Sequence, residues 1–237
     1  MGSAFQFKQF AVAQDRCAMK IGTDGVLLGA WTPVDGNPER ILDIGSGTGV
    51  LALMLAQRCD AQQIDALEIE PNAYEQCVEN FEASPWGDRL FCYHASLKMF
   101  MEEPEDSYDL IVSNPPFYQE DMPSGDRARD KARQASALPF EELVKSAAKL
   151  LSPEGIFALV IPYKEEAAFV QLAELSGLFL KKATRVKGTA ETATKRSLLA
   201  FSFRKVPVET DELVTEEKRH LYTQAYVELT RDFYLKM

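Results

Sequence analysis

The chain has 237 residues, of which 46% are hydrophobic and 26% are charged, and its formal net charge is −10. This length suffices for one α/β domain with a good core. We expect a cytoplasmic protein, because no apolar segment approaches the length of a membrane span and the N-terminus lacks a signal peptide's basic-then-apolar pattern. Four cysteines without C-x-x-C spacing and only two histidines argue against a zinc site or a disulfide framework, so we expect no metal.

The charge is distributed unevenly along the chain. Residues 39–119 contain 15 acidic and 4 basic side chains, a net charge of −11, whereas residues 120–205 contain 11 acidic and 15 basic side chains, a net charge of +4. The acidic total argues against tight, non-specific binding of nucleic acid. A local basic region can nevertheless bind the phosphates of a polyanionic substrate.

The first forty residues contain two local patterns. Alternating aromatic residues between positions 5 and 10 predict a short strand or hairpin arm. A turn over residues 21–25 precedes a helical pattern that begins at Val26. Thr23 or Asp24 is expected either to cap this helix or to contact a cofactor or substrate, and the sequence does not separate the two roles.

Residues 40–49 read as a strand that runs into a glycine-rich turn. Gly45, Gly47 and Gly49 permit positive φ and let a ligand approach the backbone closely. The G-x-G-x-G spacing differs from the dinucleotide fingerprint G-x-G-x-x-G, and the Lys-Ser/Thr ending of a P-loop is absent. Asp43 would repel a pyrophosphate but attract the ammonium group of an amino-acid-bearing cofactor such as S-adenosylmethionine.

A second strand over residues 64–68 ends in Glu68, roughly twenty residues after the glycines. Doubly wound folds place a carboxylate at this point, where it binds the hydroxyl groups of a ribose. Glu70 is the nearby alternative for the same role.

The apolar residues 108–113 predict a buried strand that ends in Asn114, Pro115, Pro116 and Phe117. Proline fixes φ and carries no N–H, and the residue before each proline is held extended. Such a corner presents carbonyl oxygens outward beside an aromatic ring. It suits a planar group that bears an NH₂, such as the amide of glutamine or the amino edge of adenine.

A long polar stretch, residues 119–136, follows this corner and contains Arg127, Arg129, Lys131 and Arg133 at alternating positions. Long loops in compact domains are usually functional or disordered. We expect this loop to be mobile in the free protein. Its basic side chains either form a solvated segment or grip the phosphates of a substrate.

From residue 40 onward, strand and helix patterns alternate, which predicts a doubly wound, mostly parallel sheet of seven strands between helices. The last two strands have no helix between them and should form an antiparallel hairpin. We expect residues 1–38 to be an N-terminal extension packed on a main domain of residues 39–237. Strands are expected near residues 40–44, 63–68, 90–93, 108–113, 155–161, 178–186 and 196–203, and helices near residues 48–58, 72–83, 138–151, 165–176 and 213–230.

In their order and spacing, the glycine turn, the acid after the second strand and the Asn-Pro-Pro-Phe corner resemble class I S-adenosylmethionine-dependent methyltransferases that act on amino groups. Further segments narrow the resemblance to one bacterial family, the tRNA (adenine-N6)-methyltransferases that modify the adenosine next to the anticodon of valine tRNA. It extends over nearly the whole chain. These segments are residues 7–10, 16–31, 84–86 and 225–235, and the Lys-x-Gly-Thr-Asp-Gly stretch of residues 20–25 is the most specific.

The resemblance implies a Rossmann-like fold in which residues 39–237 form the methyltransferase domain. It also implies methyl transfer to the exocyclic N6 of an adenosine in tRNA, without metal. Related enzymes usually have an acid after the third strand, where this chain offers Ser96, a weaker acceptor for the cofactor's adenine. The residues expected to bind the cofactor are Thr23, Asp43, Gly45, Gly47, Gly49, Glu68, Ser96 and Asn114. Those expected to act on the base are Asn114, Pro115 and Phe117, and those expected to bind other parts of the substrate are Pro116, Tyr118, Arg127, Arg129, Lys131 and Arg133.

Three alternatives remain open from the sequence. The same corner would fit the side-chain amide of a protein glutamine, or an amino group in DNA or rRNA. A non-catalytic protein that binds RNA or a nucleotide is a third reading. A monomer is the default expectation, because no long exposed apolar stripe is evident.

Overall fold

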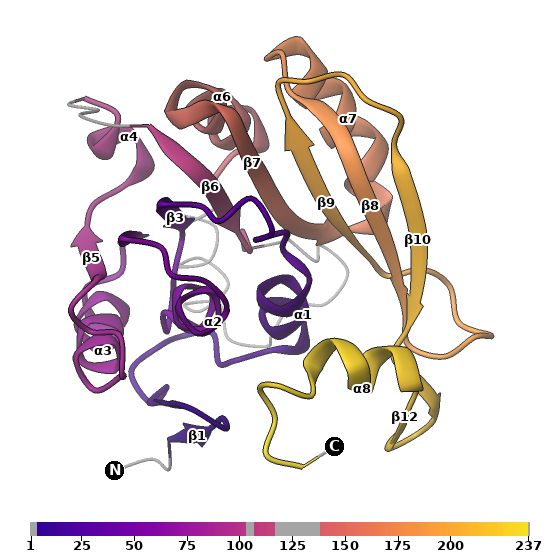
Figure 1. The fold of residues 1–237 in the computed structure, drawn as a ribbon, viewed down its shortest axis with the longest axis horizontal. Helices are drawn as coiled ribbons and strands as arrows, with labels where there is room; N and C mark the ends of the chain where they lie inside the picture. Colours follow the sequence, from indigo (N-terminus) through magenta and orange to yellow (C-terminus); the bar gives the residue numbers. More distant parts are fainter. Residues whose placement is uncertain (1–3, 103–106, 117–137, 237) are drawn as a thin grey trace, which may run out of the picture.

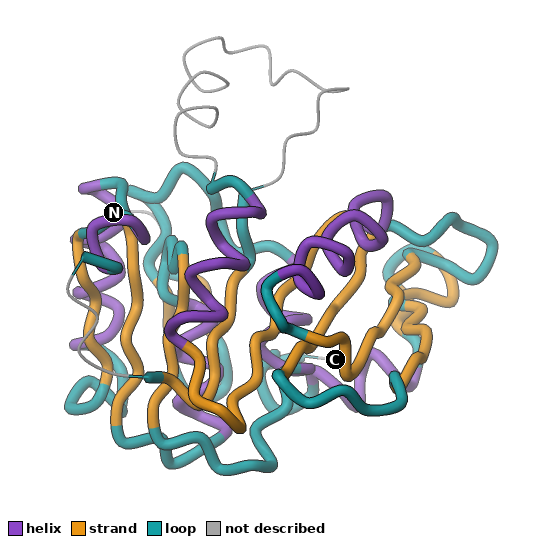
Figure 2. Tube along the Cα trace, turned by 90° about the horizontal axis from the view of Figure 1, so that it is seen from above, coloured by secondary structure: helices purple, strands orange, loops and turns teal. Residues whose placement is uncertain are grey.

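The structure, a computed structural model, describes residues 4–102, 107–116 and 138–236. Within these residues one central sheet has the strand order β10-β8-β9-β7-β6-β3-β4-β5 (Figures 1 and 2). Its strands, in chain order, are β3 (Arg40–Ile44), β4 (Gln63–Glu68), β5 (Leu90–His94), β6 (Tyr108–Ser113), β7 (Leu151–Pro162), β8 (Phe179–Lys187), β9 (Arg196–Ser202) and β10 (Glu209–Val214).

The pairing within this sheet is mostly parallel. β5, β4, β3, β6 and β7 pair with one another in parallel, so their carboxyl ends lie along the same edge of the sheet. β9 runs antiparallel between β7 and β8, with Ala183 opposite Leu199, which confirms the expected hairpin. Ligands bind at this carboxyl edge in open α/β sheets.

Helices cover both faces of the sheet, as continuous apolar strands require. The side chain of Ile41 belongs to one core cluster, whereas those of Leu42 and Ile44 belong to the other. None of the described helices is both long and apolar enough to span a bilayer. The first face carries α1 (Thr23–Trp31), α2 (Val50–Arg58), α3 (Pro71–Glu82) and α8 (Gln224–Thr230), and the second carries α4 (Leu97–Phe100), α6 (Phe140–Leu150), the 3₁₀ turn η1 (Tyr163–Glu165) and α7 (Glu166–Leu175).

The N-terminal arm is a short hairpin of β1 (Phe5–Gln6) and β2 (Ala11–Val12), as the sequence predicts. It lies against the C-terminal segment, because Phe7 forms a β-bridge with Tyr234 and the N–H of Lys8 donates to the carbonyl of Phe233 at 2.8 Å. The aromatic rings of the arm are part of the same core as α1 and α2. The division of the chain at residue 38 stays a prediction.

The expected helix over residues 213–230 is wrong for most of its length, and the sheet has eight strands where seven were expected. Residues 209–214 instead form β10, which pairs in parallel with the outer edge of β8 and satisfies its backbone groups. A hairpin follows, made of β11 (Glu216–Lys218) and β12 (Leu221–Tyr222), with His220 at a φ of 66° in its turn. Only residues 224–230 are helical, and the Thr223 hydroxyl caps their start by accepting from the Tyr226 N–H.

Candidate active site at the carboxyl edge of the sheet

The glycine turn follows β3 and connects it to α2. Gly45, Gly47 and Gly49 have φ values of 77°, 55° and 79°, a region that residues with a side chain rarely adopt. A Cβ added at Gly45 or Gly47 would meet no atom within 4 Å, whereas one at Gly49 would lie 2.6 Å from the ring of Phe81. The first two glycines therefore line open space that a ligand can enter, and the third lets α2 and α3 pack closely.

Asp43 lies at the end of β3 beneath this turn, and its side chain is fully buried. Within the described part of the chain, neither carboxylate oxygen has a hydrogen-bond partner. Burial raises the pKa of Asp43 to about 7, and the nearby backbone N–H of Ala52 offsets only part of that rise. A buried carboxylate without a partner is costly, so this site fits a cationic group such as the ammonium of S-adenosylmethionine.

Glu68 is the acid that reaches the glycine turn. Its Oε2 accepts the N–H of Gly47 at 2.8 Å, and its Oε1 accepts the N–H groups of Ile69 and Glu70 at 2.9 and 2.8 Å. These donors fix the carboxylate, and Oε2 retains a lone pair for a ligand hydroxyl. The alternative, Glu70, is used differently: it caps α3 by accepting the N–H of Ala73 at 2.7 Å.

The corner after β6 is described as far as Pro116. The Ser113 hydroxyl donates to the carbonyl of Ile44 at 2.8 Å, which ties the end of β6 to the end of β3. Pro115 is buried and Asn114 is half-buried. The corner therefore lies directly beside the glycine turn, as adjacent parallel strands require. The remaining predicted substrate residues, Phe117, Tyr118, Arg127, Arg129, Lys131 and Arg133, lie outside the described residues.

The start of α1 also contacts this corner, a contact that the sequence did not predict. A Cβ built on Gly25 would lie 3.7 Å from Nδ2 of Asn114 and 3.6 Å from a methyl group of Val50. These are ordinary van der Waals distances, so the first turn of α1 packs directly against the corner. The Lys-x-Gly-Thr-Asp-Gly stretch contained the residue, but no periodicity or charge pattern marked its contact.

The capping role considered for Thr23 and Asp24 is wrong. Gly22 is the N-cap of α1, and no side chain caps the helix. Asp24 instead accepts a hydrogen bond from Nε of Arg196, at the start of β9, at 2.8 Å. Thr23, the first residue of α1, is exposed to solvent and therefore accessible to a ligand.

Ser96 follows β5 and begins α4. Its hydroxyl oxygen accepts the N–H of Met99 at 3.2 Å, so it serves as the cap of that short helix. The oxygen keeps one lone pair and its own proton. A cofactor contact at Ser96 is thus sterically open but weaker than the usual carboxylate would give.

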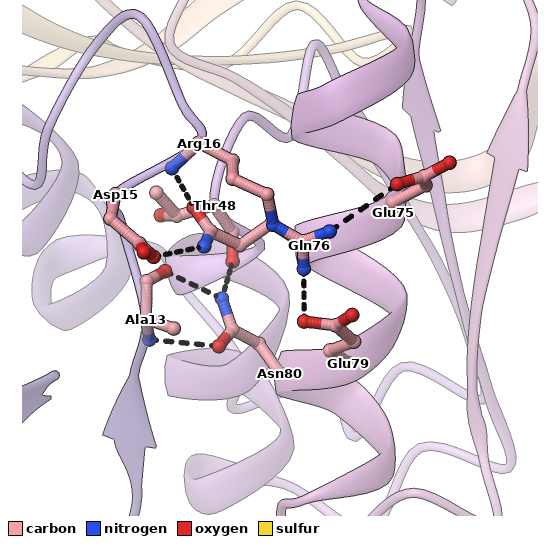
Figure 3. A network of polar contacts seen from close by, with 8 residues as sticks. All are labelled: Ala13, Asp15, Arg16, Thr48, Glu75, Gln76, Glu79 and Asn80. Atoms are coloured by element: carbon pink, nitrogen blue, oxygen red, sulfur yellow. Dashed lines mark hydrogen bonds and ion pairs between the residues drawn. The ribbon is translucent and has the colours of Figure 1, made fainter. Parts of the chain in front are cut away.

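Two buried amides on α3 bind the N-terminal segment, and one of them, Asn80, also binds the glycine turn (Figure 3). Nδ2 of Asn80 donates to the carbonyls of Ala13 and Thr48 at 3.0 and 2.9 Å, and its Oδ1 accepts the N–H of Ala13 at 2.8 Å. Gln76 accepts the N–H of Arg16 at 3.0 Å. The segment before α1 therefore supports the loop that borders Asp43.

This arrangement defines the class of protein. Three features occur together at this edge: a glycine turn above the unpaired Asp43, a second acid at the end of β4, and a proline corner after β6. This combination is typical of S-adenosylmethionine-dependent methyltransferases with a Rossmann-like fold. The fold comparison agrees. A predicted O-methyltransferase of Agrobacterium tumefaciens is similar with a TM-score of 0.69 at 16% identity, over 89% of this chain and 96% of that one. The ribosomal protein L11 methylase of Lactobacillus delbrueckii is similar with a TM-score of 0.53 at 18% identity, over 75% of this chain and 76% of that one.

Sequence comparison gives the particular family. Residues 22–189 match the methyltransferase small domain. The tRNA1(Val) (adenine(37)-N6)-methyltransferase of Flavobacterium johnsoniae is 64% identical over 98% of this chain and 100% of its own length, and that of Bacteroides fragilis is 47% identical over 98% of both. The chain belongs to the family of tRNA1(Val) (adenine(37)-N6)-methyltransferases. It is an enzyme, and its cofactor is S-adenosylmethionine.

Proposed function

We propose that this enzyme transfers the methyl group of S-adenosylmethionine to N6 of adenosine 37 in valine tRNA. The observation that carries the proposal is the position of Asn114. Its side chain lies half-buried at the end of β6, beside the glycine turn and against the start of α1. An acceptor at this place lies next to the cofactor site, where the amino group of a base must sit during transfer. Identity to the tRNA-modifying relatives over nearly the whole chain supports the choice of substrate.

The residues of the chain hold the cofactor by complementary charge and shape. Asp43 would bind the ammonium group, Glu68 a ribose hydroxyl, and the open faces of Gly45 and Gly47 would let the ligand lie against the backbone. When bound, S-adenosylmethionine supplies a methyl group that is already strongly electrophilic. The protein must therefore align the acceptor and stabilise the charge that develops on it.

Asn114 and Pro115 would perform this alignment. The Oδ1 atom of Asn114 and the backbone carbonyl of Pro115 each accept one N6–H of the base. Two acceptors outside the plane of the base favour a pyramidal nitrogen whose lone pair points at the methyl group. They also stabilise the positive charge that develops on that nitrogen. Phe117, outside the described residues, is proposed to stack on the extruded base and offset part of the cost of unstacking it.

The Asn114→Ala variant tests this mechanism. We expect single-turnover methylation to fall by roughly a hundredfold or more, as loss of a preorganised polar partner typically does, with little change in cofactor affinity. Asn72→Ala is the matched control, because Asn72 is exposed in the first turn of α3. Near-full turnover in Asn114→Ala would rule out the two-acceptor mechanism.

The substrate is tested separately with labelled S-adenosylmethionine and bulk tRNA from a strain that lacks the gene. Nucleoside mass spectrometry should find N6-methyladenosine at position 37 of valine tRNA. Label in protein glutamine would favour the amide alternative, and label in rRNA or DNA would favour another nucleic acid. Cofactor binding without any methyl transfer would leave the non-catalytic alternative. We also propose that the enzyme acts as a monomer, which light scattering with and without tRNA checks.

A further inference from the structure

A groove with a volume of about 410 Å³ lies between the N-terminal arm, the start of α1 and the C-terminal segment. This volume is within the range of pockets that hold small ligands. The groove has no role in the chemistry described above. We refer to it as the tyrosine groove, and the residues that define it here are Phe5, Thr23, Tyr222, Tyr226, Tyr234 and Lys236.

Tyr222 and Tyr226 form a stacked platform in this groove. Their ring centroids are 4.9 Å apart and their planes differ by 29°. Tyr226 is only 3% exposed and supports the ring of Tyr222, which is 41% exposed. An exposed aromatic ring held on a buried one is a preorganised surface for a flat ligand. Proteins that bind single-stranded nucleic acid use such rings as stacking platforms for bases.

Tyr234 is a further aromatic residue of the groove, and contacts with the N-terminal arm hold it in place. Tyr234 packs edge-on against Phe5, with ring centroids 6.2 Å apart, and it stacks on Phe7 at 6.0 Å. The bridge between Phe7 and Tyr234 fixes the backbone of both segments. These aromatic side chains of the groove are therefore ordered, which lowers the entropy lost when a ligand binds.

The groove and the proposed catalytic corner both border the start of α1. Gly22 and Thr23 line it, and Gly25, two residues beyond Thr23, faces the Asn114 amide at 3.7 Å from its built Cβ. An α-helix rises 1.5 Å per residue, so Thr23 and Gly25 are separated by only about 3 Å along the axis of α1. α8, which carries Tyr226, lies beside α1 (Figure 1). Because the groove and the corner border the same first turn of α1, a strand of RNA whose adenine reaches Asn114 can place a neighbouring nucleotide at the groove.

The chemistry of the groove suits a nucleotide. Its described lining includes one basic side chain, Lys236, one acidic side chain, Glu216, and the hydroxyl groups of Thr23 and Thr215. A phosphate is therefore expected on the side of Lys236, away from the Glu216 carboxylate. A cation beside aromatic faces matches a phosphate beside a base. A second pocket, lined by Lys8, Gln57 and Arg58, has no aromatic side chain and lies at the C-terminal end of α2, away from the carboxyl edge of the sheet.

We propose that the tyrosine groove binds an unstacked nucleotide of the tRNA that flanks the target adenosine. The base stacks on the outer face of Tyr222 and the adjacent phosphate pairs with Lys236. The proposal rests on the proposed function, because it takes tRNA as the substrate. It assigns the C-terminal segment a direct part in holding the strand from which the adenine is extruded.

The test compares binding of full-length valine tRNA by the wild type, Tyr222→Ala and Tyr222→Trp. We expect Tyr222→Ala to weaken binding about tenfold, as loss of one stacked base does, while Tyr222→Trp retains it and cofactor affinity is unchanged in both. Phe91→Ala is the matched control, because Phe91 is 44% exposed on β5 at the far end of the sheet. Thermal melting of each variant verifies that it is folded.

Lys236→Ala provides a second, independent measurement. We expect it to leave the fold intact and to lower the slope of log affinity against log salt by about one, the value for one phosphate contact. A wild type that methylates tRNA while Tyr222→Ala binds it equally well overturns the groove proposal and leaves the proposed function standing. An unchanged salt slope in Lys236→Ala removes the phosphate contact. A wild type that neither binds nor methylates tRNA overturns both proposals.

Discussion

Replacing Asp43 with asparagine separates the cost of a buried charge from its benefit in the cofactor site. Burial raises the pKa of this carboxyl from its usual 3.8 to about 7. The folded protein therefore holds the proton more tightly than the unfolded chain does, and stability is greatest below the unfolded pKa. This contribution to stability is lost as pH rises from about 4 toward 7. With 1.36 kcal/mol for each unit of pKa, the full loss is on the order of 4 kcal/mol.

The magnitude that can be measured is a difference between two proteins at two pH values. Between pH 5 and pH 8, we expect the unfolding free energy of Asp43→Asn to rise by about 2–3 kcal/mol relative to the wild type, because ionisation over this interval penalises only the carboxyl. All other titrating groups are shared and cancel. Urea denaturation without cofactor at both values gives the result. A difference that does not change with pH would show that Asp43 titrates normally, and the argument from burial would be wrong.

Ionisation of Asp43, which lowers the stability of the free protein, should increase its affinity for the cofactor. The ammonium group of S-adenosylmethionine pairs with the ionised form of Asp43, so the affinity of the wild type should fall as pH drops below about 7, by up to tenfold per unit. In Asp43→Asn we expect weak binding that does not vary over this range. Isothermal calorimetry at pH 6 and pH 8 measures both. Equal affinity of the wild type at the two values would mean that another group carries the contact.

The remaining predictions concern the support of the glycine turn. Asn80→Ala removes three hydrogen bonds, of which that to the carbonyl of Thr48 is buried, and should lower the unfolding free energy by about 2–4 kcal/mol in urea denaturation. Cofactor affinity should fall with it, and unchanged stability would contradict the assigned network. Gly49→Ala should cost about 3–5 kcal/mol, because it combines a positive φ with a contact of 2.6 Å to Phe81. Gly45→Ala should lower the unfolding free energy by only about 1–2 kcal/mol, since its Cβ meets open space. Its main effect should be weaker cofactor binding, measured by isothermal calorimetry.

The parallel core of the fold was predictable because its signals are local. The strands near residues 40–44, 63–68 and 108–113 are short segments rich in apolar residues that run into turn-forming residues, and the structure places them at those bounds. The C-terminal region was not predictable in this way. Apolar residues spaced four apart occur only between residues 221 and 229, so the helical pattern does not extend back to residue 213. The edge of β8 is instead paired by a strand over residues 209–214. The competing signal was Thr223, whose hydroxyl marks the true start of α8.

The candidate site likewise contains residues whose location could be predicted from local sequence and contacts that only the structure reveals. The location of Asp43 and Glu68 at the carboxyl edge could be predicted from the sequence, because the ends of neighbouring parallel strands lie side by side. Their roles toward the cofactor stay predictions. The contact between Gly25 and Asn114, and the stack of Tyr222 on Tyr226, required coordinates, because the first joins segments about ninety residues apart and the second depends on a hairpin that the sequence concealed. The residues proposed for methyl transfer thus lie in short motifs, whereas the surface proposed to bind the flanking nucleotide is assembled from the two ends of the chain.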